Sequence, residues 1–164
     1  MKLQKNHAAL YVTRGALIAA MYVALTYVSS VFGLSGGVIQ FRISEMLCIL
    51  PIFFPEAIPA LFIGCILSNL LTGAIIWDVI FGSIATLIGA IGARLLRKLP
   101  RRLAFISTLP TVIANAFIIP AVLILAYGLE GGYFFFLLTV SIGELVCASV
   151  LGTALYYPMK KFKL

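Results

Sequence analysis

The stretch Arg94-Leu95-Leu96-Arg97-Lys98-Leu99-Pro100-Arg101-Arg102 divides a chain that is otherwise almost free of charge. Two further basic clusters stand near the N-terminus (Lys2, Lys5, Arg14) and the C-terminus (Lys160, Lys161, Lys163), so eleven of the twelve Lys and Arg residues fall in three groups. Basic residues that flank apolar spans stay on the cytoplasmic side of a membrane. The pattern therefore predicts an integral membrane protein in which an even number of spans separates each cluster from the next.

The composition is also typical of a chain embedded in a bilayer. Apolar residues make up 63% of the sequence and charged residues 10%, whereas a soluble domain is about one quarter charged. At about 20 residues per spanning helix, 164 residues leave room for roughly six helices, so we expect one transmembrane domain over residues 1–164. The net charge of +7 is explained by orientation in the membrane, and no basic stripe on a polar face indicates nucleic-acid binding.

Six apolar segments follow one another along the chain, each bounded by charges or by helix-breaking residues. They are residues 15–32, 41–54, 57–77, 78–93, 103–129 and 133–159. Gly33-Leu34-Ser35-Gly36-Gly37 separates the first two, and the helix of the third is expected to end near Thr72-Gly73. The second segment is short, about 21 Å as an α-helix, and would cross only where neighbours shelter it. We predict an all-α fold of six transmembrane helices with both termini cytoplasmic and Arg42 as the one external basic residue.

Polar side chains within the apolar segments are the candidate binding residues, because an unpaired ionisable group at mid-membrane costs several kcal/mol. On the predicted topology they all fall in the outer half of the membrane, where one outward-opening cavity would hold them together. They are Gln40, Arg42, Glu45, Asn69, Trp77, Asp78, Asn115 and Glu144.

Four of these residues also have purely structural explanations. Arg42 and Glu45 are three residues apart on a helix and could pair with each other. Asp78 could cap the N-terminus of the fourth segment, and Trp77 could be an interfacial anchor.

Three polar residues lie deeper in their segments. Asn69 and Asn115 could form hydrogen bonds between helices. Glu144 differs because its own segment contains no basic residue before the C-terminal lysines. We therefore favour a ligand-binding role for Glu144.

Motifs for catalysis and for nucleotide binding are missing from the sequence. It contains no G-x-x-x-x-G-K-[ST] loop and no H-E-x-x-H or G-x-S-x-G pattern, so we expect a non-enzymatic protein without cofactor or metal. Cys48, Cys65 and Cys147 are dispersed and form no C-x-x-C pair, which predicts buried free thiols. Transport of a solute against its gradient would then take its energy from another protein.

A stripe of small residues runs along the first segment. Ala16, Ala20 and Ala24 recur every four residues, and small residues allow two membrane helices to approach closely. The stripe could receive a partner protein or pack within the chain's own bundle.

Several motifs resemble those of a known transporter family. They are Gln40-Phe41-Arg42-Ile43-Ser44-Glu45, Leu61-Phe62-Ile63-Gly64-Cys65 with Asn69-Leu70, Asp78-Val79-Ile80-Phe81-Gly82-Ser83 with Ala85-Thr86-Leu87, and Gly143-Glu144-Leu145. Together with six short spans and the alanine stripe, they resemble the substrate-binding (S) components of energy-coupling factor (ECF) transporters. Within that group the chain resembles the queuosine-precursor transporter (QueT) family, from about residue 8 to residue 160.

The resemblance implies a function and a set of partners. The chain would capture a 7-deazaguanine such as preQ1, preQ0 or queuine at the bacterial cell membrane. It would assemble with a transmembrane coupling subunit and two cytoplasmic ATPase subunits, and Ala16, Ala20 and Ala24 would face the coupling subunit. The loaded component would then topple in the membrane and present its site inward when ATP is used.

The residues fit such a ligand on chemical grounds. The expected contacts are Glu144, Asn69, Asn115, Gln40, Phe41, Arg42, Glu45, Trp77 and Asp78. Glu144 is expected to accept the ring N–H and the exocyclic amine together, and the three amide side chains to meet the carbonyl and remaining ring atoms. Trp77 or Phe41 would stack on the base, and Asp78 or Glu45 would meet an aminomethyl cation.

Other functions stay open at this stage. The chain could be an S component for another vitamin or purine-like solute, or a self-sufficient secondary transporter that works as an oligomer. A membrane enzyme that uses Glu144 as an acid or base, and a structural subunit without ligand, are further alternatives.

Overall fold

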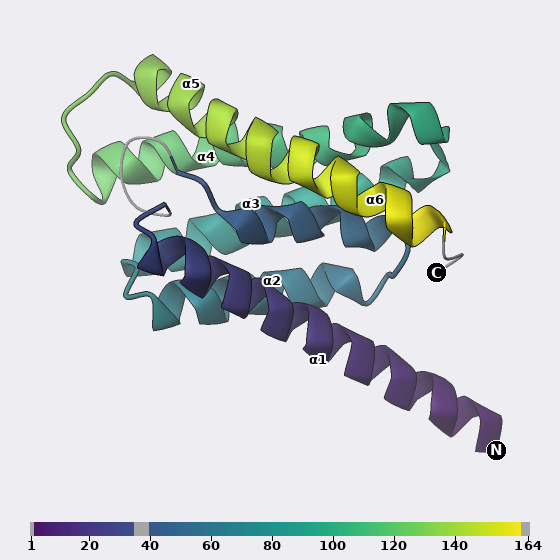
Figure 1. Cartoon of the computed structure of the whole chain (residues 1–164). Coiled ribbons are helices and arrows are strands. Elements are labelled where there is room, and N and C mark those ends of the chain that lie inside the picture. Colours follow the sequence, from purple (N-terminus) through teal and green to yellow (C-terminus); the bar gives the residue numbers. More distant parts are fainter. Residues whose placement is uncertain (1, 35–39, 162–164) are drawn as a thin grey trace.

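The structure is a computed structural model that describes the backbone of residues 2–34 and 40–161, and the side chains from His7 onward within those ranges. Over this part every regular element is a helix and no strand occurs (Figure 1). The longer helices are α1 (Lys2–Val31), α2 (Ala57–Leu71), α3 (Ile76–Leu95), α4 (Leu109–Leu125), α5 (Tyr133–Glu144) and α6 (Gly152–Lys161). Tighter or wider helical turns form η1 (Ile43–Ile52), η2 (Leu96–Lys98), η3 (Arg101–Thr108) and η4 (Leu145–Leu151).

Four helical stretches among the described residues are long and apolar enough to cross a membrane. They are His7–Val31, Ile76–Lys98, Arg101–Leu125 and Tyr133–Lys161. The other two apolar helices, η1 and α2, are shorter. The prediction of an all-α membrane protein is confirmed, whereas the count of six crossings stays a prediction.

The short second segment is a 3₁₀ helix enclosed by its neighbours. Within η1, residues 44, 45 and 47–51 are all buried, against α1, α3, α6 and η4. A 3₁₀ helix rises about 2 Å per residue, so the ten residues of η1 extend roughly 20 Å. Arg94 Nη1 donates hydrogen bonds to the carbonyl oxygens of Pro51 and Ile52 at 3.0 and 3.1 Å, which satisfies the end of this helix. Neighbouring helices therefore enclose this short segment, as its length requires if it is to cross the membrane.

Turn residues set most of the other helix boundaries. α2 ends at Leu71 and is followed by Gly73 at φ +74°, as predicted, because glycine adopts a positive φ without a steric penalty. α3 begins at Ile76, two residues before the predicted start. α4 begins at Leu109 instead of Leu103 because η3 precedes it, and Pro110 occupies its first turn, where a missing N–H is tolerated.

The last segment is continuous but not uniform. α5 ends at Glu144, the wider π-type turns of η4 follow, and α6 completes the helix to Lys161. Interruptions of this kind often occur at functional sites, because an extra residue in a turn re-aims the side chains beside it.

Glycines allow the helices to approach one another closely. A Cβ at Gly64 would lie 3.0 Å from the Cβ of Tyr22, so α1 and α2 pack backbone to backbone at this point. A Cβ at Gly89 would overlap Thr111, which brings α3 and α4 together in the same way.

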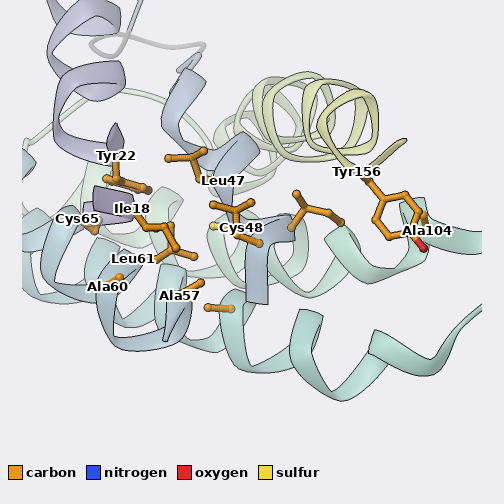
Figure 2. Close-up of a cluster of buried hydrophobic side chains, with 13 residues drawn as sticks. Ile18, Tyr22, Leu47, Cys48, Ala57, Ala60, Leu61, Cys65, Ala104 and Tyr156 are labelled. Atoms are coloured by element: carbon orange, nitrogen blue, oxygen red, sulfur yellow. The ribbon is translucent and has the colours of Figure 1, made fainter. Parts of the chain in front are cut away.

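A buried apolar cluster joins α1, η1, α2 and α6 (Figure 2). It includes Ile18 and Tyr22 of α1, Leu47 and Cys48 of η1, Leu61 of α2 and Tyr156 of α6. Cys48, Cys65 and Cys147 are all buried and none is in a disulfide within the described residues. The prediction of buried free thiols is confirmed.

The basic residues gather toward one end of the bundle. Figure 1 shows the N-terminal end of α1, the α3–α4 connection and the C-terminal end on the same side. Arg101 lies over the ring of Tyr157, 5.0 Å from its centroid, so the central and C-terminal clusters approach each other. The side chains of Lys2 and Lys5, residues 35–37 of the predicted glycine break, and Lys163 lie outside the described residues. The α2–α3 and α4–α5 connections lie at the opposite end (Figure 1).

Candidate functional site: a polar cavity around a buried ion pair

A polar cavity of about 340 Å³ lies where α1, α2 and α3 meet the segment that leads into η1. Its polar lining comes from Thr26, Ser30, Arg42, Asn69, Thr72, Asp78 and Tyr127. Residues 72–74 of the α2–α3 connection also line it, so the cavity lies at the end of the bundle opposite the basic clusters. Its volume lies in the range of roughly 300–1,000 Å³ that is typical of small-molecule sites.

A buried ion pair forms one wall of this cavity. Arg42 Nη2 donates a hydrogen bond to Asp78 Oδ2 at 2.9 Å, and both side chains are less than one tenth exposed. The hydroxyl of Tyr127 donates to the same oxygen at 3.3 Å. Asp78 Oδ1 has no hydrogen-bond partner among the described residues. A buried charge is tolerated when it is paired in this way, because the partner compensates for the lost hydration.

The turn between α2 and α3 positions Asn69 and Asp78. The chain reverses at Gly73, and Asn69 Nδ2 then donates to the backbone carbonyl of Asp78 at 3.3 Å. This bond joins the two helices. The residue that caps α3 is Ile75, and Asp78 lies inside the first turn with no capping hydrogen bond from its side chain. Asp78 therefore does not cap α3, because its carboxylate is turned toward Arg42, but its place in the first turn still gives the expected favourable contact with the helix dipole.

Glu45 does not line the cavity and belongs to a polar network in the interior. Its side chain is 1% exposed and accepts hydrogen bonds from the Tyr22 hydroxyl, from Thr86 Oγ1 at 3.3 Å and from Cys48 Sγ at 3.1 Å. Within the described chain Arg42 forms its ion pair with Asp78, so the alternative pairing of Arg42 with Glu45 is wrong. Arg42 precedes η1 with an extended backbone (φ −94°, ψ 94°), so it does not share a helix face with Glu45.

Glu144 points into the bundle and not into lipid. It is 6% exposed, and its Oε2 has no hydrogen-bond partner among the described residues. The preceding Gly143 packs directly on the backbone carbonyl of the buried Gln40. Glu144 is thus buried beside the segment that leads to Arg42, but it does not belong to the cavity lining.

Three further predicted site residues are not among those that line the cavity. Trp77 is 53% exposed and stacks on Phe81, with ring centroids 6.0 Å apart, in an apolar groove between α3 and α4. Asn115 is buried in α4 and donates to the carbonyl oxygen of Thr111 in its own helix at 3.1 Å. Phe41 is half-buried beside the cavity residue Arg42. Arg42, Asn69 and Asp78 therefore share the cavity, while the side chains of Trp77 and Asn115 do not reach it.

Sequence reasoning missed several hydroxyl groups of the cavity. Thr26 and Ser30 lie one turn apart on α1, and Thr72 and Tyr127 lie just past the C-terminal ends of α2 and α4. Hydroxyl residues are common in membrane helices and carry no charge. The free-energy cost of placing a charge in the membrane, which identifies Arg42 and Asp78, therefore does not identify them. The helical spacing of the α1 hydroxyls was the available signal.

These features define a multi-pass membrane protein with a solute-sized polar cavity between its helices. A family model described as "QueT transporter" matches residues 12–161. The chain therefore belongs to the QueT transporter family, and it is a protein of the bacterial cell membrane.

A curated relative from Lactococcus lactis subsp. cremoris (strain MG1363) is named "Queuosine precursor transporter QueT". It is 44% identical to this chain over 73 residues, which is 44% of this chain and 43% of the relative's length. No solved structure matches the chain.

Proposed function

We propose that this chain is the substrate-binding S component of an ECF-type ATP-driven importer that takes up a queuosine precursor. The substrate would be a 7-deazaguanine such as preQ1, preQ0 or queuine. Membership of the QueT transporter family and the name of the Lactococcus relative support the substrate class. The single observation that carries the proposal is the cavity of about 340 Å³ with a buried ion pair on its wall. One oxygen of that pair, Asp78 Oδ1, has no hydrogen-bond partner among the described residues.

The proposed topology has six crossings within one domain, residues 1–164, and both termini in the cytoplasm. Four long apolar helices and the two shorter ones support this count, since the buried surroundings of η1 let a short helix cross within protein. The position of the basic clusters at one end supports a cytoplasmic location for that end. The cavity, at the other end, would then open to the outside.

The proposed ligand contacts are Arg42, Asn69 and Asp78. All three line the cavity and present charged or amide groups to it. Gln40, Glu45 and Glu144 are buried close behind, where they would hold the wall in place. Asp78 takes the ligand-binding role that the sequence favours for Glu144, because Asp78 is the carboxylate that faces the cavity.

A measurement on Glu144 tests this reassignment. Glu144→Gln preserves the side-chain shape and removes the ionisable group, and we expect the affinity for 7-deazaguanine to fall by less than about tenfold, because the residue does not line the cavity. Isothermal titration of the purified protein in detergent gives the dissociation constant. A loss of about 100-fold with an unchanged melting temperature would return Glu144 to direct ligand contact.

The proposed partners are a transmembrane coupling subunit and two cytoplasmic ATPase subunits. Ala16, Ala20 and Ala24 are all exposed on α1, which supports contact with a partner over packing within the chain's own bundle. Exposed large apolar residues also surround it, Leu17 and Met21 among them. A helix face of this kind would accept a closely packed helix of the coupling subunit.

Enlarging the stripe is expected to separate binding from transport. Ala16→Leu with Ala20→Leu should leave 7-deazaguanine binding by the isolated chain unchanged, since the stripe faces away from the cavity, but should reduce co-purification with the ATPase subunits about tenfold or more. Pull-down and cellular uptake measure the two effects. Val150→Leu, at another exposed apolar position, is the matched control. Full uptake by the double variant would exclude the stripe as the docking surface.

Thermal-shift measurements with deazapurines and vitamins test the function as a whole. A raised melting temperature with a 7-deazaguanine supports the proposal, since a ligand that binds only the folded state stabilises it. A response only to another vitamin would keep the class of protein and overturn the substrate. Uptake by the lone chain in liposomes would instead support the self-sufficient transporter.

A further inference from the structure

We propose that the basic end of the bundle binds the phosphate of an anionic phospholipid, through Arg101, Lys160 and Lys161 gathered around the ring of Tyr157. This site lies at the end opposite the polar cavity, so it does not depend on which solute the cavity takes. The proposed topology places the basic end in the cytoplasm, and the lipid would then belong to the inner leaflet.

An arginine held over an aromatic ring is the centre of this site. The guanidinium carbon of Arg101 lies 5.0 Å from the centroid of the Tyr157 ring. Arg101 begins η3 and Tyr157 belongs to α6, so the contact joins two segments that are far apart in the chain. Arg101 is itself exposed, and a guanidinium over a ring keeps its N–H donors at its edge, where they can bind an anion.

Two lysines lie on the same face of α6 as this ring. Lys160 and Lys161 follow Tyr157 by three and four residues, and residues at these spacings are neighbours on a helix surface. Long side chains on a helix lean toward its N-terminus, which directs both lysines back over the turn that carries Tyr157. Three exposed cations therefore gather around one ring.

The acidic residues of the chain do not balance these cations within the part that the structure describes. Of the five, Glu56 pairs with Arg14, Glu130 lies in the α4–α5 connection at the opposite end, and the other three are buried in the interior. Like charges held close together repel one another. The cluster is therefore complementary to an anion that comes from outside the chain.

Apolar side chains beside the cluster favour a lipid as the source of that anion. Leu103 and Phe105 follow Arg101 in η3 and are 37% and 47% exposed. In a membrane protein, exposed leucine and phenylalanine are best accommodated by hydrocarbon, whereas arginine and lysine extend toward the headgroups. A phospholipid supplies both environments, because its phosphate meets the cations and its acyl chains meet the apolar side chains.

Titration of the intact chain with short-chain lipids in dodecyl maltoside tests the site. Dioctanoyl phosphatidylglycerol is compared with dioctanoyl phosphatidylcholine, whose phosphate is neutralised by its own ammonium group, and with inorganic phosphate. We expect phosphatidylglycerol to raise the melting temperature and to bind about tenfold or more tightly than phosphatidylcholine. Inorganic phosphate at the same concentration should leave the melting temperature unchanged, since it has no acyl chains.

Two double variants separate this cluster from the overall positive charge. Lys160→Gln with Lys161→Gln should weaken the binding of phosphatidylglycerol about tenfold or more, because each basic residue adds to the attraction for an anionic lipid. Lys2→Gln with Lys5→Gln removes the same charge from the N-terminal end of α1, which Figure 1 shows apart from α6, and is the matched control. This control should bind the lipid within about twofold of the natural chain.

Arg101→Lys distinguishes a defined phosphate site from a diffuse attraction. The substitution keeps the charge but removes the planar group that can donate two parallel hydrogen bonds to a phosphate. We expect the binding of phosphatidylglycerol to weaken about fivefold. Arg97→Lys, at an exposed position in η2, is the control and should bind as the natural chain does.

Equal binding of the two lipids, or an equal loss in the two double variants, would overturn the inference, because only the overall charge would then matter. A response to inorganic phosphate as large as that to phosphatidylglycerol would assign the cluster to a soluble anion instead. If Lys160→Gln with Lys161→Gln loses the ATPase subunits in a pull-down but keeps its lipid affinity, the surface belongs to a partner protein. The comparison of lipids on the natural chain decides the question even if a variant does not fold, and the proposed function stands or falls separately at the cavity.

Discussion

Arg42→Met is expected to abolish ligand binding and to destabilise the protein. Arg42 is the partner of the buried Asp78, and removing it leaves an uncompensated carboxylate inside the bundle. Breaking a buried pair from one side costs about 3–5 kcal/mol, part of which is recovered if the carboxylate takes up a proton. The affinity for 7-deazaguanine should fall about 100-fold or more, because one ligand contact is lost and the other is perturbed. Thermal unfolding and titration calorimetry in detergent measure the two effects.

The double variant Arg42→Met with Asp78→Leu separates stability from recognition. Replacing both charges by apolar side chains is often neutral or stabilising, so the melting temperature should return toward that of the natural chain while binding stays lost. Arg97→Met, an exposed cation at the basic end, is the control and should change neither property. Retention of both stability and affinity by Arg42→Met would contradict the role assigned to the ion pair.

Gly143→Ala is expected to destabilise the fold and weaken binding together. A Cβ at this position would overlap the backbone carbonyl of Gln40, which cannot move aside as a flexible side chain can. Overpacking in a core costs about 1–3 kcal/mol, and the shift would act on the segment that carries Arg42. The melting temperature should therefore fall by about 2–4 °C per kcal/mol, as for soluble proteins of this size, with a loss of ligand affinity.

Gly132→Ala is the matched control for this substitution. Gly132 has an ordinary φ of −77°, and no atom lies within 4 Å of the Cβ that alanine would add. Its melting temperature should equal that of the natural chain. A Gly143→Ala protein that melts at the same temperature as the Gly132→Ala protein would show that α5 does not pack on the backbone of Gln40 as described.

The helical segments could largely be predicted because their signals are local. The apolar runs and the Thr72-Gly73 break define α2 without reference to any other helix. The start of α4 could not be placed in this way, since η3 begins in the basic cluster and continues into the same uncharged run. The 3₁₀ form of η1 was also missed, because it depends on the neighbours that enclose residues 44–51.

The candidate site was predictable in content but not in arrangement. The cost of burying polar groups in a membrane singles out Arg42, Asp78 and Glu144 from the sequence alone. This cost does not say which carboxylate forms an ion pair with Arg42. Glu45, only three residues away, was the nearer candidate in the chain. Asp78, 36 residues away, is the observed partner because the α2–α3 turn brings it there.

Hydropathy and the spacing of Lys and Arg were thus sufficient to establish from the sequence a multi-pass helical membrane protein with its basic clusters on one side. Both are properties of contiguous stretches of sequence, so they do not depend on how the helices pack against one another. The tertiary structure alone decided that Arg42, Asn69 and Asp78 share a cavity while Trp77 and Asn115 face elsewhere. Successive residues of a helix point about 100° apart, so small differences in helix start and rotation determine which side chains meet.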